Sequence, residues 1–298
     1  MFKGAITALI TPFKDGKLDE EGYQSFIEWQ ISQGIHGVVP CGTTGESPTL
    51  SHVEHNRVIE LCIEAVAGRV PVIAGSGSNS TEEAIMMASH AKIVGADAIL
   101  VVTPYYNKPS QEGMYQHFKA IHDAVEIPII IYNIPGRSVV DLQDDTIARL
   151  AKLPNVVGIK DATGDLSRVS KLRMKVSSDF CQLSGEDGTA LAFNAQGGVG
   201  CISVTANIAP KLCASLHDTW FKGDVKKALA IHDKLMPLHL AMFCETSPGP
   251  VKYAASLLGY CRPELRLPLV EPTDASKAYI RTVMESLGIL ETALSHTA

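Results

Sequence analysis

Short apolar runs rich in valine and isoleucine recur along this chain at nearly regular intervals, and this repeat constrains the fold more than any other feature. The runs are spaced about 20–35 residues apart, which is the length of a strand together with its following helix. Most of them lack polar alternation, as expected for parallel strands buried on both faces. We therefore expect eight strands, at residues 5–10, 37–40, 70–74, 98–102, 127–132, 156–160, 180–183 and 199–204.

Helical periodicity occupies the intervals between these runs. In residues 51–67 the apolar positions follow the i, i+3, i+4 rule, and a second helix is expected over residues 84–94. Both helices have a capping box at the start and a glycine as a stop signal, namely Ser51 with Glu54 before Gly68, and Ser80 with Glu83 before Gly95. Eight strands alternating with helices predict an α/β fold, the (β/α)8 or TIM barrel.

The last quarter of the chain lacks strand signals. It predicts helices at about residues 224–243, 248–259 and 274–290, with a proline-rich connector between the last two. We therefore expect a catalytic barrel over residues 1–223 and a C-terminal helical region over residues 224–298, as an appendage to the barrel.

Composition excludes several classes of protein. The 298 residues include 26 Lys and Arg against 32 Asp and Glu, a formal charge of −6, and no basic patch indicates nucleic-acid binding. No apolar run reaches about 18 residues, so no membrane span is expected. The apolar start of the chain is short and has no A-x-A cleavage site, so we interpret it as the first strand. The seven cysteines are scattered without a CxxC pair, which is typical of a reducing, cytoplasmic setting.

Polar residues gather where the predicted strands end, which is where chemistry lies in this fold. Lys160 closes the run 156–160 and is expected to point into or over the barrel core. Removing an ammonium from water favours the neutral amine, which is a nucleophile toward carbonyl groups. The alternative is a lysine whose ammonium reaches solvent or pairs with Asp161. Tyr132 ends the preceding strand, where its phenol would pass protons to a Schiff base or simply pack at the rim.

Two further features suit a carboxylate substrate. The glycine-bounded turn 42–45 can present backbone N–H groups and hydroxyls to an anion, or can be a tight turn only. Arg137 in a later loop could bind a carboxylate in bidentate fashion, or be a solvated surface side chain. His52 and His55 have the i, i+3 spacing of metal ligands, but no third ligand is evident, so an exposed first helical turn is favoured and no metal is expected. No GxGxxG or P-loop occurs, so no nucleotide is implied.

Five segments resemble the dihydrodipicolinate synthases, and the resemblance covers essentially the whole chain. These synthases are members of the wider superfamily of pyruvate-dependent, lysine-dependent aldolases, which includes N-acetylneuraminate lyase. The YN-x-P-x-R arginine and the TPYYN-x-PSQEG loop narrow the resemblance to the synthases. The segments are GTTGES (42–47), TPYYNKPSQEG (103–113), YNIPGR (132–137), GIKDATGD (158–165) and LSGED (183–187).

The resemblance implies that Lys160 forms a Schiff base with pyruvate, and that the derived enamine attacks L-aspartate 4-semialdehyde. The product is 4-hydroxy-tetrahydrodipicolinate, in the committed step of diaminopimelate and lysine biosynthesis. No cofactor is implied beyond the covalent Schiff base. The implied proton relay is Tyr132, Thr43 and Tyr106, the last supplied by a neighbouring subunit. Substrate contacts are implied for Thr44 with the pyruvate carboxylate, Arg137 with the semialdehyde carboxylate, and Gly185 and Ile202 in the lining.

The resemblance also implies a homotetramer, as a dimer of dimers, and feedback inhibition by L-lysine at the dimer interface. The positions that match the lysine site are Ser47, Pro48, His52, His55, Asn79, Glu83 and Tyr105.

Three alternatives stay open at this stage. A sister lyase, such as N-acetylneuraminate lyase or an oxo-acid aldolase or dehydratase, shares the lysine and the tyrosine but generally lacks the arginine at position 137. A non-catalytic binding protein would have lost Lys160 or the relay residues. A metal-dependent barrel enzyme needs clustered ligands at the strand ends, which the sequence does not show.

Overall fold

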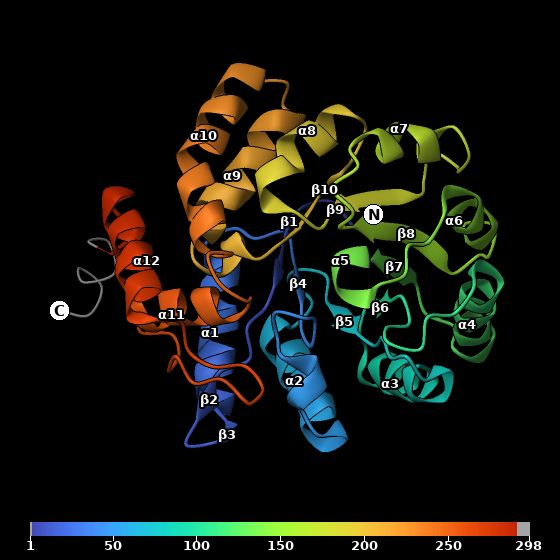
Figure 1. Cartoon of the computed structure of the whole chain (residues 1–298), viewed down its shortest axis with the longest axis horizontal. Helices are drawn as coiled ribbons and strands as arrows, with labels where there is room; N and C mark the ends of the chain where they lie inside the picture. Colours follow the sequence, from blue (N-terminus) through green and yellow to red (C-terminus); the bar gives the residue numbers. More distant parts are fainter. Residues whose placement is uncertain (1, 291–298) are drawn as a thin grey trace. The chain divides into compact units, whose positions relative to one another are not determined.

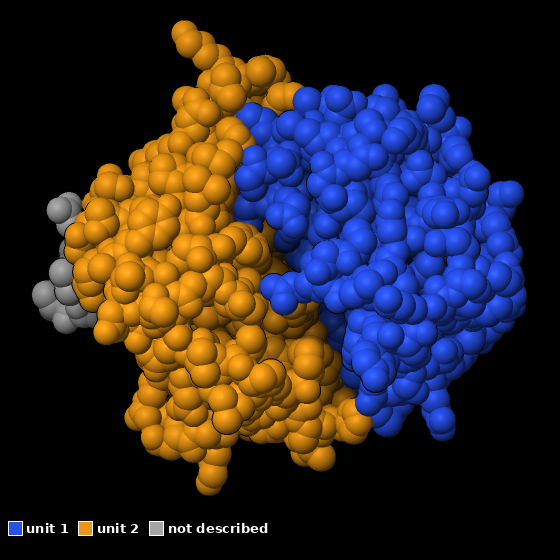
Figure 2. Space-filling model, in the orientation of Figure 1, with its two compact units in different colours: residues 1–4, 71–202 blue, residues 5–70, 203–298 orange. Residues whose placement is uncertain are grey.

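The computed structural model of this chain describes residues 2–290. They form two compact units, shown in separate colours in Figure 2. Among the described residues, unit 1 consists of residues 2–4 and 71–202, and unit 2 consists of residues 5–70 and 203–290. Strands and helices alternate along most of the chain, and helices alone follow the last strand (Figure 1).

Unit 1 is built on parallel strands whose order in the sheet follows their order in the chain. Nearly all of their residues are buried, as expected for apolar runs covered on both faces. These strands are β5 (Ile73–Gly75), β6 (Ala98–Val102), β7 (Ile129–Asn133), β8 (Val156–Asp161), β9 (Cys181–Ser184) and β10 (Gly200–Ser203).

Helices connect the strands of unit 1, as parallel pairing requires. Neighbouring helices pack in chain order, α3 against α4, α4 against α6, and α6 against α7. Serine caps begin two of them, because the hydroxyls of Ser80 and Ser110 accept backbone N–H groups of the first helical turns. The helices of unit 1 are α3 (Thr81–Val94), α4 (Gln111–Ala124), α5 (Pro135–Ser138), α6 (Asp144–Leu150), α7 (Ser167–Arg173), η2 (Asp187–Thr189) and α8 (Ala190–Ala195).

Unit 2 contains the parallel pair β1 and β4, with Ile6 opposite Gly37, and a largely helical remainder. Helix α1 packs against α2, α9 against α10, and α12 against both α10 and α11. The elements of unit 2 are β1 (Gly4–Ala8), β2 (Phe13–Lys14), β3 (Lys17–Leu18), α1 (Glu20–Ser32), β4 (Gly37–Val39), η1 (Ser47–Thr49), α2 (His52–Val66), η3 (Thr205–Asn207), α9 (Pro210–Phe221), α10 (Val225–Ala241), α11 (Gly249–Leu257) and α12 (Asp274–Ser286).

All eight predicted strands are present, but some of their ends differ from the prediction. The run expected at 70–74 becomes β5 at Ile73–Gly75. Pro71 has no backbone N–H to donate, and the N–H of Val72 donates to the Asp97 carboxylate at 2.8 Å. Neither residue therefore has an N–H available to the strand pairing, and the strand begins at Ile73.

The hairpin formed by β2 and β3 was not predicted. Asp15 and Gly16 at its tip have φ angles of 55° and 79°. Two consecutive positive φ angles are those of a type I′ turn, which Asp-Gly favours. The signal was therefore present in the sequence as an Asp-Gly pair between two-residue strands.

The predicted helix starts and C-terminal helices are largely confirmed. Ser51 and Glu54 form the expected capping box. At the second box Ser80 accepts from Glu83 N as expected, but the Ser80 N–H donates to Ser78 Oγ at 3.0 Å, and Ser78 in turn donates to the Glu83 carboxylate. Helices α10, α11 and α12 fall within the three predicted ranges. The proposed division at residue 223 stays a prediction, and residues 291–298 of that region lie outside the described residues.

Candidate active site

Lys160 lies near the end of β8 and is 6% exposed. Its Nζ is 4.1 Å from the centroid of the Tyr132 ring, and the two residues are opposite each other in the β7–β8 pairing. The burial rules out the alternative of an ammonium in solvent. Strand alternation puts Asp161 on the other face, where its Oδ1 accepts from the Thr163 N–H and hydroxyl at 2.8 and 2.6 Å. The Lys160 amine and the Tyr132 ring therefore lie side by side in a buried environment.

A glycine two residues before Lys160 sets the spacing between β8 and β9. A Cβ at Gly158 would lie 2.5 Å from the Cys181 carbonyl oxygen and 2.8 Å from Cys181 Cβ. Gly158 and Lys160 are on the same face of the strand because side chains alternate. Only glycine allows this close approach, so the placement of Lys160 depends on it.

Arg137 belongs to α5, a single turn that follows β7 directly. A hydrogen bond from the end of β6 stabilises this turn, since the Thr103 hydroxyl donates to Ser138 Oγ at 3.1 Å. Ser138 Oγ also lies 2.9 and 3.0 Å from the carbonyl oxygens of Ile134 and Val140. Arg137 itself is exposed. Its backbone is thus fixed beside the end of β7.

Glu186 is a member of this electrostatic group that the sequence analysis left out of the site. Burial raises the pKa of its carboxyl, the adjacent Asp187 raises it further, and the positive charges of Lys160 and Arg137 oppose the rise. The signal was available, because Glu186 stands in the LSGED segment at the end of β9.

The glycine-bounded turn 42–45 follows β4 in unit 2. The N–H groups of Gly45 and Ser47 donate to Gly42 O at 3.0 and 3.4 Å, and the Thr11 hydroxyl donates to Gly45 O at 2.7 Å. Thr44 is 4% exposed and Thr43 is half-buried. The turn is therefore tightly closed and carries its threonines at a strand end, as the sequence predicts.

The remaining predicted site residues, two substrate contacts and one member of the proton relay, lie in unit 1. Ile202 is buried in β10, and Tyr106 is 88% exposed with a positive φ of 72°. Gly185 has a packing reason for its lack of a side chain, because a Cβ there would lie 2.7 Å from Ala162 Cβ. Its N–H donates to Asp161 O at 2.7 Å.

The residues that match the lysine site divide between the two units. Ser47, Pro48, His52 and His55 belong to unit 2, and Asn79, Glu83 and Tyr105 belong to unit 1. The expectation that both histidines are exposed on the first turn of the helix is wrong for His55. His52 is exposed, but His55 is 3% exposed because the fourth residue of α2 faces inward beside Cys41, whose thiol donates to His55 O at 3.5 Å.

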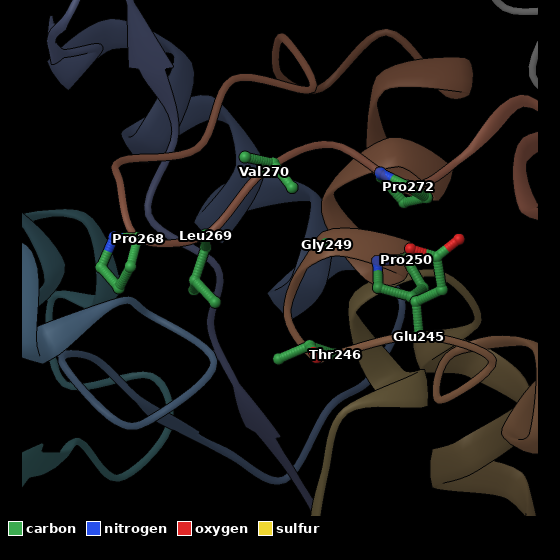
Figure 3. Close-up of a pocket in the computed structure, with 8 residues that line it drawn as sticks. All are labelled: Glu245, Thr246, Gly249, Pro250, Pro268, Leu269, Val270 and Pro272. Atoms are coloured by element: carbon green, nitrogen blue, oxygen red, sulfur yellow. The ribbon is translucent and has the colours of Figure 1, made fainter.

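Unit 2 also holds a hollow of about 280 Å³, drawn in Figure 3. None of the predicted site residues lines it, and its Glu245 carboxylate accepts from the Thr273 N–H and hydroxyl at 2.9 and 2.7 Å. The lining residues are Glu245, Thr246, Gly249, Pro250, Pro268, Leu269, Val270 and Pro272.

Residues 2–290 contain neither a metal-binding cluster nor a membrane-spanning helix. No group of three or more His, Cys, Asp or Glu side chains in this range is arranged to hold a metal ion. No helix in the same range is long and apolar enough to cross a membrane.

Comparison with known proteins shows to which family of lyases the chain belongs. Residues 1–287 match the profile of the dihydrodipicolinate synthetase family. The chain belongs to this family. The 4-hydroxy-tetrahydrodipicolinate synthase of Rhodospirillum centenum is 65% identical to it over 290 residues, which are 97% of this chain and 100% of the relative. The chain is accordingly an enzyme with 4-hydroxy-tetrahydrodipicolinate synthase activity, a lyase of the lysine and diaminopimelate pathway.

Solved structures support the fold and give context for ligands. The chloride-inhibited dihydrodipicolinate synthase from Acinetobacter baumannii, complexed with pyruvate, is 46% identical, with a TM-score of 0.95 over 97% of this chain and 100% of that chain. The enzyme from Cyanidioschyzon merolae with lysine bound is 37% identical, with a TM-score of 0.94 over 97% and 99% of the two chains. The predicted parallel eight-strand barrel with C-terminal helices is confirmed by these similarities.

Proposed function

We propose that this enzyme condenses pyruvate with L-aspartate 4-semialdehyde through an imine on Lys160. The observation that carries the proposal is the buried Lys160 amine, 4.1 Å from the Tyr132 ring centroid at the ends of adjacent strands. A lysine shielded from water can act as a nucleophile, and a neighbouring phenol can carry protons. The pyruvate complex of the Acinetobacter baumannii relative supports pyruvate as the first substrate.

The proposed reaction balances with one water released. The Lys160 amine adds to C2 of pyruvate and water leaves, which forms the imine. Loss of a C3 proton gives the enamine, whose C3 attacks the aldehyde carbon of the semialdehyde while the aldehyde oxygen gains a proton. The amino group of the semialdehyde then adds to the imine carbon. Closure of the ring releases the Lys160 amine and 4-hydroxy-tetrahydrodipicolinate.

The proton transfers are assigned to Tyr132, Thr43 and Tyr106. Tyr106 is proposed to act on the site of a neighbouring subunit in a tight dimer, within a homotetramer. Its 88% exposure and its positive φ of 72° suit a phenol held outward for another chain. The location proposed for this tetramer is the cytoplasm.

The two substrate carboxylates are assigned to two different donors. The backbone N–H of Thr44 is proposed for the pyruvate carboxylate, because the closed turn 42–45 presents such groups without a flexible side chain. Arg137 is proposed for the semialdehyde carboxylate, because guanidinium forms paired hydrogen bonds with carboxylates. Gly185 and Ile202 are proposed as lining.

We also propose that L-lysine inhibits the enzyme at the site formed by Ser47, Pro48, His52, His55, Asn79, Glu83 and Tyr105. The structure of the Cyanidioschyzon merolae relative has lysine bound, which supports lysine as a ligand of this enzyme. The Glu83 carboxylate suits the ammonium of the ligand, although it also accepts from the Ser78 hydroxyl.

Steady-state turnover tests both proposals in one experiment. Product formation from pyruvate and L-aspartate 4-semialdehyde is measured with and without millimolar L-lysine. Turnover that falls with lysine supports the reaction and the regulation. Turnover that ignores lysine removes the regulatory proposal, and a folded enzyme without turnover removes the assignment of substrates.

A further inference from the structure

Glu46 directly follows the glycine-bounded turn 42–45 and is both buried and unusual in its backbone conformation. It is 1% exposed, and its backbone is left-handed, with φ 55° and ψ 35°. The left-handed conformation is unfavourable for any residue other than glycine, so surrounding contacts must stabilise it here. Its own N–H donates to Thr43 O at 3.2 Å, and its carbonyl oxygen accepts from the Thr49 hydroxyl at 3.1 Å.

The Glu46 carboxylate is held by two groups from the C-terminal region. Lys252 Nζ donates to Oε1 at 2.6 Å, and the backbone N–H of Arg266 donates to Oε2 at 3.1 Å. The side chains of both Glu46 and Lys252 are fully buried. Burial lowers the pKa of Lys252, and the Glu46 charge opposes this shift.

An aromatic ring completes the arrangement. Lys252 Nζ and the Arg266 guanidinium carbon lie 4.1 and 4.3 Å from the centroid of the Phe13 ring. Arg266 Nη1 also donates to Thr49 O at 2.9 Å, just after Glu46. Lys252 belongs to α11 and Arg266 to the connector before α12, and other residues of both segments line the hollow in Figure 3. Lys252 and Arg266 thus both form hydrogen bonds with residues 46–49, the short segment that follows the turn.

A buried ion pair of this kind is a poor way to gain stability, since the cost of removing two charges from water largely cancels their attraction. Apolar side chains of similar size would serve as well or better. What the pair supplies instead is a fixed direction and distance at one point of the backbone. That point is two residues from Thr44 and three from Thr43.

We propose that Lys252 is a positioning residue for pyruvate, which acts through Glu46 to hold the turn 42–45 in its carboxylate-binding shape. The C-terminal region is thereby part of the working site, although none of its side chains need touch substrate. This inference rests on the proposed function, in which the turn binds the pyruvate carboxylate.

The test compares Lys252→Met, Glu46→Gln and the double variant with the native full-length enzyme. Lys252→Met alone leaves a buried carboxylate without its cation, so it is expected to melt at a lower temperature. The double variant removes both charges and keeps the volumes, so it serves if the single variant does not fold. The control is Leu235→Ala, a fully buried change in α10 that lowers the melting temperature without touching the turn.

The readout is KM for each substrate separately, together with kcat. We expect KM for pyruvate to rise about tenfold or more in the double variant, with KM for the semialdehyde unchanged, because small displacements of a binding group have large effects. Leu235→Ala should leave both KM values unchanged. An unchanged pyruvate KM in the double variant, or equal changes for both substrates that follow the melting temperature in all variants, would overturn the inference. Failure of the proposed function is distinct, since the native enzyme itself would then not turn over.

Discussion

Gly158 offers a sharp test of how the strand spacing controls the chemistry. In Gly158→Ala the new Cβ would lie 2.5 Å from the Cys181 carbonyl oxygen. The neighbouring strand must retreat by about 0.9 Å to restore an ordinary contact of 3.4 Å. The obstacle is backbone, which cannot rotate away as the end of a long side chain can. Overpacking of this kind costs about 1–3 kcal/mol, and we expect the upper part of that range.

The same displacement reaches Lys160, which lies two residues further along the same face of β8. A misplacement of about 1 Å can cost about 10²-fold in rate. We therefore expect kcat/KM to fall about a hundredfold. Thermal unfolding should shift down by about 5–10 °C, at roughly 2–4 °C for each kcal/mol. Both quantities are measured on the same preparation by steady-state kinetics and calorimetry.

Gly136→Ala is the matched control for the exchange itself. A Cβ at Gly136 meets nothing within 4 Å. That position lies in α5, where alanine is a better helix former than glycine, so stability should hold or rise slightly. If Gly158→Ala melts and turns over like the native enzyme, then the spacing of β8 and β9 does not place Lys160, and the reasoning is wrong.

Three further predictions concern other parts of the chain. Arg137→Ala should raise KM for the semialdehyde about tenfold to a hundredfold, since a charge-assisted contact is worth about 1.5–3 kcal/mol; a change confined to pyruvate KM would contradict its role. Tyr106→Phe should lower kcat about a hundredfold with an unchanged melting temperature, because the exposed phenol carries protons and packs little; native kcat would remove it from the relay. The Arg266 guanidinium lowers the pKa of Glu54 to about 2, below its ordinary value of 4.5. The stability from Glu54 is therefore present above about pH 4.5 and lost as the pH falls toward 2, and after solvent screening it amounts to about 1–2 kcal/mol. Denaturant unfolding at pH 7 and pH 3 should show a smaller difference for Glu54→Gln, and an equal difference would refute this assignment.

The fold was predictable because its signals are local. Buried parallel strands require apolar residues on both faces, so each of the eight strands shows in its own few residues, as in residues 98–102, which form β6 in full. The capping box at Ser51 and Glu54 is likewise a four-residue pattern. The strand ends were less predictable, because they depend on partners far along the chain, such as Asp97 for Val72.

The residues of the candidate site likewise differ in whether a local sequence signal predicts them. Lys160 and Tyr132 were predictable because each ends an apolar run, and parallel strands bring such ends to one edge. The contact between Glu46 and Lys252 joins residues 206 positions apart, and nothing near either one indicates the other. The burial of His55 was not predicted, because the i, i+3 spacing by itself does not show which side of α2 faces the core.

The central claim is that the Lys160 amine forms the imine with pyruvate. Its most direct test is reduction with borohydride in the presence of pyruvate, followed by peptide mass spectrometry of the full-length enzyme. The account predicts a stable pyruvate-derived adduct on the peptide that carries Lys160, loss of activity in proportion to labelling, and no adduct in Lys160→Met. An adduct on another lysine, such as Lys252, or full activity with Lys160 labelled, would contradict it.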